Sequence, residues 1–235
     1  MATLLIRLAG PQQSYGGYRY SVRTVGTSPV PTRSAVAGMI GACLGVTDYL
    51  RLLDRFTMRV RIDRTNPPES DLQVTVGPKA HEEVAWKRIR NLNDPLGKIP
   101  RNISVTGLSG KNDTSLAHRG FISHAEFIVE LTVSDDDAAA WKEALRHPVH
   151  TPCLGRNGFA PAFPFYLGEW TGEGDALEAL PHVPRTDRRA EPGPVPIVEV
   201  AGDRAKSEPR PTGTVAPARA SRTEQLAWMK ENLHR

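Results

Sequence analysis

The sequence lacks several features that would assign it at once to a known class. Its 235 residues include two cysteines, Cys43 and Cys153, and neither belongs to a CxxC pair. They cannot build a disulfide framework, so we expect a reducing, cytoplasmic setting. No apolar run approaches the length of a membrane span. The first residues, MATLLIRLAG, lack a leading basic region and a cleavage-site pattern, so we expect a strand there and not a signal peptide.

Motifs of cofactor-dependent enzymes are also missing. The sequence has no Walker A motif, no dinucleotide-binding glycine pattern and no GxSxG elbow. His147, His150 and Cys153 lie three residues apart, a spacing that suggests zinc. However, Pro148 and Pro152 break any helix that would bring these side chains to one face, and no convincing fourth ligand follows. We therefore expect neither a metal nor a cofactor.

Acidic residues are absent from the first 47 positions, and Asp48 is the first. Within this acid-free part, the stretch PQQSYGGYRYSVRTVGTSPVPTRS places tyrosines and arginines among glycines. Tyrosine rings can stack on unpaired bases, arginines can meet phosphates, and a helix start at residues 32–34 adds free N–H groups that favour an anion. The stretch indicates a nucleic-acid surface, and a solvated loop with a few packed tyrosines is the alternative. Its aromatic and basic residues are Tyr15, Tyr18, Tyr20, Arg19, Arg23 and Arg33.

A second basic segment covers residues 79–119, where eight lysines and arginines face four acids. Trp86 stands close to Lys87, Arg88 and Arg90 in this segment, a pattern typical of a basic arm that grips a nucleic-acid strand or a neighbouring subunit. A solvated, charged face is the alternative.

The hydrophobic periodicity predicts an α+β fold. Apolar runs or alternation at 3–8, 57–62, 72–76 and 125–133 indicate strands, and Ser134 and Thr32 or Ser34 are placed to cap two helices. The first helix also carries Gly38, Gly41 and Gly45, which leave a small face for close packing. The order β-α-β-β-α-β matches a ferredoxin-like fold. Beyond Pro181 the prolines predict a poorly ordered or extended linker before a terminal helix around 224–233.

Catalysis is a further possibility that the residues leave open. A metal-free ribonuclease needs a base to activate a ribose hydroxyl and an acid for the leaving oxygen, and His118, His124 and Tyr15 are residues of the required types. Histidines in basic clefts more often bind than cleave.

Four motifs, in this order, resemble a known family: LLIRLAGPQQSYG, PTRSAVAGMIGACLGV, SVTGL at 104–108 and HTPCLGRNGFAP. The chain is similar over residues 1 to about 170 to the CasD subunits of type I-E CRISPR Cascade complexes, which act in antiviral defence. The resemblance implies a palm of ferredoxin-like, RNA-recognition-motif type at 1–77 and 119–180. It also implies an inserted basic thumb at 78–118, and a proline-rich C-terminal extension with a short terminal helix then occupies 181–235.

The function implied by the resemblance is that of a non-catalytic RNA-binding subunit. Such proteins hold the 5′ handle of the crRNA and cap the backbone filament. They contact the first backbone subunit and the large subunit, and they reach target DNA only through the complex. In a related subtype the equivalent subunit is a metal-independent endoribonuclease that processes CRISPR repeat RNA, so that activity is the alternative.

The resemblance also implies residue roles. Gln13 and Tyr15 would hold one handle nucleotide, and the helix start at 32–34 would hold a phosphate. Arg119 and the loop at 152–156 would line a pocket for another nucleotide, although relatives often have tyrosine where this chain has Cys153. The RNA-binding residues expected are Gln13, Tyr15, Arg19, Arg23, Thr32, Arg33, Ser34, Arg119, Pro152, Leu154, Gly155 and Arg156. The thumb residues expected are Lys79, Trp86, Lys87, Arg88, Arg90, Lys98 and Arg101.

Overall fold

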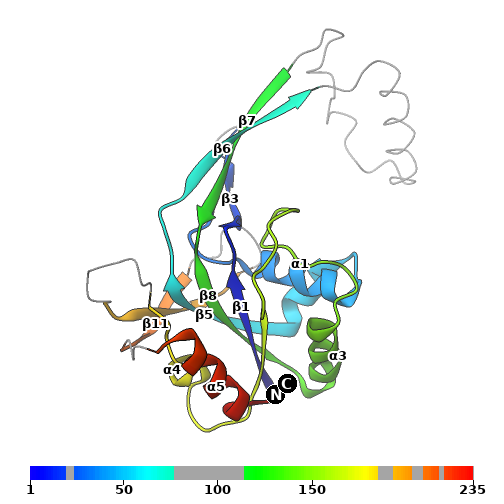
Figure 1. Cartoon of the computed structure of the whole chain (residues 1–235). Helices are drawn as coiled ribbons and strands as arrows, with labels where there is room; N and C mark the ends of the chain where they lie inside the picture. The colour runs from blue at the N-terminus through cyan, green and yellow to red at the C-terminus, as the bar shows by residue number, and fades with distance from the viewer. Residues whose placement is uncertain (20–23, 77–113, 185–192, 203–208, 217–219, 235) are drawn as a thin grey trace.

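The computed structural model describes residues 1–19, 24–76, 114–184, 193–202, 209–216 and 220–234 (Figure 1). Within these ranges, seven strands form the main sheet in the order β11-β10-β5-β8-β1-β9-β12. Their bounds are Ala2–Ala9 (β1), Phe56–Arg64 (β5), Glu126–Val133 (β8), Tyr166–Trp170 (β9), Val195–Val200 (β10), Pro209–Val215 (β11) and Leu233–His234 (β12). Neighbouring strands of this sheet are antiparallel. The α+β class predicted from the sequence is confirmed.

Helices α1 (Arg33–Leu44) and α3 (Asp135–Arg146) begin at residues that the sequence predicts as caps. The Thr32 side chain accepts a hydrogen bond from the Ala35 N–H, and the Ser134 side chain accepts one from the Asp137 N–H. Gly45 ends α1 in the left-handed conformation, with φ at 71°, a region that favours glycine. Among the described residues, no single helix is long and apolar enough to cross a membrane.

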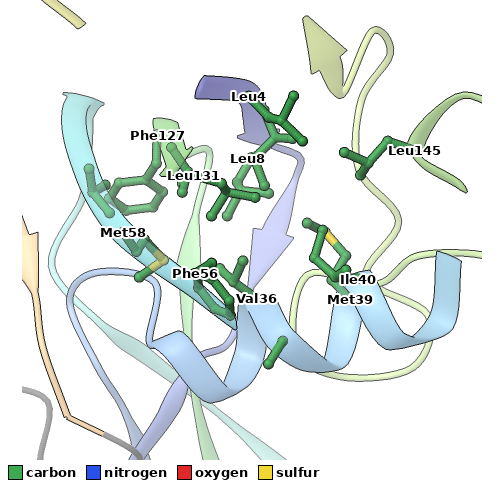
Figure 2. Close-up of a cluster of buried hydrophobic side chains, with 14 of the residues drawn as sticks. Leu4, Leu8, Val36, Met39, Ile40, Phe56, Met58, Phe127, Leu131 and Leu145 are labelled. Carbon is green, nitrogen blue, oxygen red and sulfur yellow. The ribbon is translucent and has the colours of Figure 1, made fainter. Parts of the chain in front are cut away.

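One face of the main sheet carries the larger hydrophobic core. Leu4 and Leu8 of β1, Phe127 and Leu131 of β8, and Met58 of β5 point to this face, because side chains alternate along a strand. Figure 2 shows these side chains meeting residues of α1, and α3 adds the buried Trp141 to the same core. The two helices therefore cover this face together (Figure 1).

The opposite face carries charged side chains and is covered by the C-terminal part of the chain. Helices α4 (Ala176–Ala179) and α5 (Arg222–Asn232) lie over it (Figure 1), around a smaller apolar cluster that includes Leu5, Ile128 and Met229. Glu126, 3% exposed, accepts hydrogen bonds from Arg7 Nε at 2.7 Å, Arg222 Nη2 at 2.7 Å and Arg64 Nη2 at 3.1 Å. Because Arg222 begins α5, this cluster fastens the helix to the sheet.

Two arginines of β5 make the same connection for α4. Arg59 pairs with Glu130 and with Asp175, the residue that caps α4. Arg61 is fully buried, forms a bidentate ion pair with Asp63 at 2.6 and 2.9 Å, and donates to the carbonyls of Leu177 and Leu180. The alternating arginines of this strand therefore pair within the fold, although the sequence suggests a half-exposed strand.

A second sheet carries the rest of the N-terminal half. It contains β2 (Gln12–Gln13), β3 (Gly16–Arg19), β4 (Thr24–Thr27), β6 (Glu69–Val76) and β7 (Thr114–Ser123). Strand β7 pairs antiparallel with β6 and β2 and parallel with β4. The β6–β7 pair rises away from the main sheet (Figure 1). A 3₁₀ helix, η1 (Tyr49–Arg55), connects α1 to β5.

Strands occur near two of the expected boundaries. The first residues of β7, 114–118, belong to the expected thumb and pair with β6. The expected linker beyond Pro181 contributes β10, β11 and β12 to both edges of the main sheet, and the terminal helix predicted there is α5. The prolines of β11 are compatible with a strand because it lies at the sheet edge. The expected thumb residues from Lys79 to Arg101 lie outside the described residues.

We predict that Glu126→Gln destabilises the fold by about 3 to 5 kcal/mol, because it leaves three arginines without their shared buried partner. Burial raises the pKa of Glu126, but the charges and hydrogen bonds of Arg7 and Arg222 outweigh burial and hold the pKa below its ordinary value of 4.5. A carboxylate whose pKa is lowered in the folded state stabilises the fold fully when the pH is above its ordinary pKa. This stabilisation is lost as the pH falls through the lowered, folded-state pKa.

Urea unfolding should therefore show the full difference between wild type and Glu126→Gln above about pH 5 and a smaller difference in more acidic buffers. Glu143→Gln, at an exposed position of α3, is the matched control. A difference that stays constant down to pH 3 would contradict the assigned role of the ionised carboxylate.

Candidate nucleic-acid interface

A cleft of about 440 Å³ lies where α1, β4, β7 and the 151–157 loop meet. Its walls are formed mainly by small and polar residues, with two arginines. The residues that line it are Ser14, Gly16, Val25, Gly26, Ser34, Ala35, Gly38, Met39, Ala42, Tyr49, Arg119, Gly120, Thr151, Cys153, Gly155, Arg156 and Asn157. Five of the residues expected in the site or its loop, Ser34, Arg119, Cys153, Gly155 and Arg156, therefore meet at one surface.

The first wall of the cleft is the start of α1. Ser34 and Ala35 line the cleft, and no acidic residue occupies the first turn of the helix. The Ala35 and Val36 N–H groups bond to Thr32, whereas the N–H groups of Arg33 and Ser34 have no acceptor among the described residues. Free N–H groups and the positive end of the helix dipole favour an anion at this position.

Strand β7 forms the second wall with Arg119 and Gly120. Arg119 is half-buried, and its guanidinium has no hydrogen-bond or ion-pair partner in the part of the chain that the structure describes. A Cβ at Gly120 would lie 2.8 Å from the Thr27 backbone nitrogen, so glycine lets β4 approach β7 closely. This wall therefore offers a cation that is free to bind a ligand.

The third wall is the 151–157 loop, which is fastened to the segment before β3. Gly155 has φ at 93°, and a Cβ there would lie 1.5 Å from the Ser14 carbonyl oxygen. The Ser14 N–H donates to the Leu154 carbonyl at 3.0 Å, and the Leu154 N–H donates to the Phe159 carbonyl at 2.7 Å. Pro152 and Leu154 are buried behind the wall, so their side chains hold the loop and do not line the cleft.

Arg156 reaches across from this loop to β6 and β7. Its Nη2 donates to the Gly120 carbonyl at 2.6 Å, and its Nη1 lies 3.3 Å from both carboxylate oxygens of Asp71. Its guanidinium also lies over the Phe159 ring, 5.1 Å from the centroid. The side chains of Arg156 and Asp71 are 20% and 39% exposed, and such partly exposed pairs contribute about 0 to 1 kcal/mol. Arg156 is thus oriented without being bound strongly to one partner.

Gln13 and Tyr15, which were expected to hold a nucleotide, are both enclosed in the core. Gln13 Nε2 donates to the Ala125 carbonyl at 2.7 Å, and the Tyr15 hydroxyl donates to Gln13 Oε1. The Tyr15 ring packs edge-on against Phe127, with centroids 6.1 Å apart, and burial raises the pKa of Tyr15 well above its ordinary value. The pair connects the end of β1 to the start of β8.

Arg33 and Thr32 also have structural partners. The Arg33 Nη2 donates to the Phe56 carbonyl at 2.8 Å and to the Leu53 carbonyl, and its guanidinium lies over the Phe56 ring. Thr32 is buried and caps α1. In the structure the Arg33 side chain therefore contacts backbone carbonyls where a phosphate contact was expected, and the helix start lines the cleft through Ser34 and Ala35. Arg23, and the side chain of Arg19, lie outside the described residues.

The residues considered for cleavage lie apart from one another in the described structure. From His118 to Ser123 the chain of β7 is extended over about 16 Å, and His124 follows with φ at 49°. Tyr15 is buried. The described residues contain no group of three or more histidine, cysteine, aspartate or glutamate side chains placed to hold a metal.

Sequence reasoning missed Tyr49 and Asp71. Tyr49 follows the acid-free part of the chain, and Asp71 lies within β6, in register with Arg119 of β7. Only the pairing of β6 with β7 could have shown that this carboxylate lies near the cleft.

Comparisons with known proteins agree on one family. The family model for a CRISPR-associated protein (Cas_Cas5) matches residues 3–227. The CRISPR system Cascade subunit CasD of Escherichia coli (strain K12) is 29% identical over 176 residues, which cover 70% of each chain. A chain of a CRISPR RNA-guided surveillance complex shares the fold over 97% of this chain and 99% of its own, with a TM-score of 0.65 at 24% identity. A Cas protein solved by crystallography matches over 93% and 97%, with a TM-score of 0.55 at 25% identity.

We predict that Gly155→Ala destabilises the loop far more than Gly158→Ala. Both glycines have φ at 93°, but a Cβ at Gly158 meets nothing within 4 Å. Gly158→Ala should therefore cost only the backbone strain, about 1 to 2 kcal/mol, whereas Gly155→Ala must also displace Ser14. Thermal unfolding of the two variants measures the difference, and equal melting temperatures would contradict the close approach of the loop to Ser14.

Proposed function

Because the chain belongs to the Cas5 family of CRISPR-associated proteins, we propose that it is the type I-E Cascade subunit that holds the 5′ handle of the crRNA without cutting it. The observation that carries this proposal is the cleft, where the start of α1 meets Arg119 and the oriented Arg156. The Arg119 guanidinium has no partner among the described residues. The family relationship to CasD makes RNA the polyanion to consider first.

The face of the main sheet that α4 and α5 cover also favours the cleft as the location of RNA. In RNA-recognition-motif domains, bases stack on the open face of the four-stranded sheet. Here α4 and α5 lie over the corresponding face (Figure 1), and its arginines are paired with Glu126, Glu130 and Asp63. The cleft is therefore the better candidate, because its cations are less fully paired.

The chemistry of the cleft suits a hooked single strand. The helix start and Arg119 would hold phosphates, which fix position without reading sequence. Four glycines line the cleft without side chains, so that backbone groups and the Asn157 amide can approach base edges. They are Gly16, Gly26, Gly120 and Gly155. Sequence preference for the handle would come from these groups and from the shape of the hook.

We propose that the chain has a ferredoxin-like palm and an inserted thumb, and the topology supports this proposal. Strands β9-β1-β8-β5 with α1 and α3 have the β-α-β-β-α-β order and antiparallel pairing of a ferredoxin-like palm. The thumb would extend from the projecting β6–β7 pair, since residues 77–113 connect these two strands. We further propose that the subunit caps the backbone filament and contacts both the first backbone subunit and the large subunit.

We predict that Arg119→Ala weakens binding of handle RNA and lowers the slope of log affinity against log salt by about one. Arg210→Ala, at an exposed position of β11, is the matched control and should leave both quantities unchanged. Arg33→Ala should lower the melting temperature without reducing the salt slope, because Arg33 binds carbonyls. Equal affinity and slope for Arg119→Ala and wild type in filter-binding titrations would refute the placement of RNA in the cleft.

We also predict that the purified chain binds labelled CRISPR repeat RNA in EDTA without cleaving it. A ribose hydroxyl needs a base and an acid on either side of one phosphate, and His118 and His124 lie too far apart for that. Gel analysis after prolonged incubation is the measurement. Cleavage that disappears in His118→Ala or His124→Ala would instead establish the endoribonuclease alternative.

A further inference from the structure

Tyr49 lies on the wall of the cleft that Arg119 and Arg156 also line. It is the first residue of η1, and it is 38% exposed. Among the described residues that line the cleft, it alone is aromatic. Tyr15 and Tyr166, by contrast, are buried.

The glycines of α1 place the Tyr49 ring against the helix. A Cβ at Gly41 would lie 2.7 Å from Tyr49 Cβ, so no side chain fits there. A Cβ at Gly38 would lie 3.8 Å from the ring carbons Cδ2 and Cε2. The Tyr49 ring thus packs against the glycine face of α1 that the sequence predicts. One side of the ring contacts the helix, and its exposed side lines the cleft.

The position of η1, and hence of the ring, is fixed by its other contacts. Leu52 and Leu53 are buried in the main core, and Arg33 at the start of α1 donates to the carbonyls of Leu53 and Phe56. The helix start and the 3₁₀ helix therefore form one rigid unit. A ring held in this way loses little further freedom when a ligand packs on it.

We propose that Tyr49 is a stacking platform for one unpaired nucleobase of the RNA whose backbone is held by Arg119 and the start of α1. Gly38, beneath the ring, lies four residues or about 6 Å along the helix from Ser34, so a base on the ring adjoins a phosphate at the helix start. The apolar side chains of Val25, Met39 and Ala42 lie in the same cleft. This inference rests on the proposed function and names the group that binds the base.

A protein partner is the competing occupant. Val46, Leu50 and Val149 are exposed apolar residues, and Val149 lies beside Gly45 at the end of α1. None of these three lines the cleft, whereas Tyr49 shares it with Arg119 and Arg156. The observations therefore favour RNA for Tyr49.

The test is a binding titration of the full chain with a labelled single-stranded RNA that has the sequence of the repeat-derived 5′ end. Tyr49→Leu keeps apolar contact with α1 but lacks a flat face for a base. If one base stacks on the ring, this change should weaken RNA binding by a factor of about five to a hundred. Tyr49→Phe should bind as wild type. The salt slope should be the same in all three, because stacking releases no counterions.

Phe163→Leu is the matched control, since Phe163 is 80% exposed and does not line the cleft. Abasic nucleotides placed singly along the RNA then identify the base. When the abasic nucleotide stands where the stacked base would be, Tyr49→Leu should cause no further loss of RNA affinity, because that base is already missing. Equal melting temperatures for Tyr49→Leu and Tyr49→Phe ensure that a loss of affinity is not a loss of fold.

Two outcomes separate this inference from the proposed function. If Arg119→Ala weakens binding while Tyr49→Leu binds as wild type, the cleft holds RNA and the stacking role is wrong. If neither change affects binding, the cleft is not the RNA site and both proposals fail. Unchanged RNA affinity together with weaker association of Tyr49→Leu with the other Cascade subunits would assign the ring to a protein interface.

Discussion

The pairing of buried carboxylates with arginines on one face of the main sheet determines what the rest of the molecule can do. Glu126, Glu130 and Asp63 are buried or nearly so, and each is bonded to arginine. These pairs bind α4 and α5 to the sheet, so five arginines of the chain are used to close the fold. Such pairs are weak evidence of net stability, but breaking one leaves an uncompensated charge. Their main consequence is that this sheet face is unavailable to a polyanion.

Glycine has a complementary role at the cleft, where three segments distant in sequence must come close together. Gly120 admits β4, Gly155 admits the backbone at Ser14, and Gly41 admits Tyr49 onto α1. Each contact would be blocked by a single Cβ. The cationic groups at the cleft are less fully paired than those of the sheet, and Asp71 only orients one of them. The same chain therefore has paired arginines that connect the helices to the sheet and less constrained arginines at the cleft that are available to a ligand.

Much of the fold could be predicted from the sequence, because it depends on local signals. Caps and periodicity identify α1, α3 and the central strands, and Ser34, Arg119, Gly155 and Arg156 do converge. The errors arise where the residue type is right but the partner is distant. Gln13 and Tyr15 have the residue types of a nucleotide site, but their partners Ala125 and Phe127 are distant in sequence. Arg33 has the residue type of a phosphate ligand, but its partner, the Leu53 carbonyl, is 20 residues away. The strands β10 and β11 were missed because both contain proline and because the pairing of β10 with β5 is not local.

Photo-cross-linking in the assembled complex tests the central claim most directly. The crRNA would carry 4-thiouridine only in its 5′ region, and cross-linked peptides would be identified by mass spectrometry after irradiation. The account predicts cross-links at the walls of the cleft, in the peptides that contain Tyr49, Arg119 and the 151–157 loop. Cross-links confined to α4, α5 or β10–β11, with none at the cleft, would contradict it.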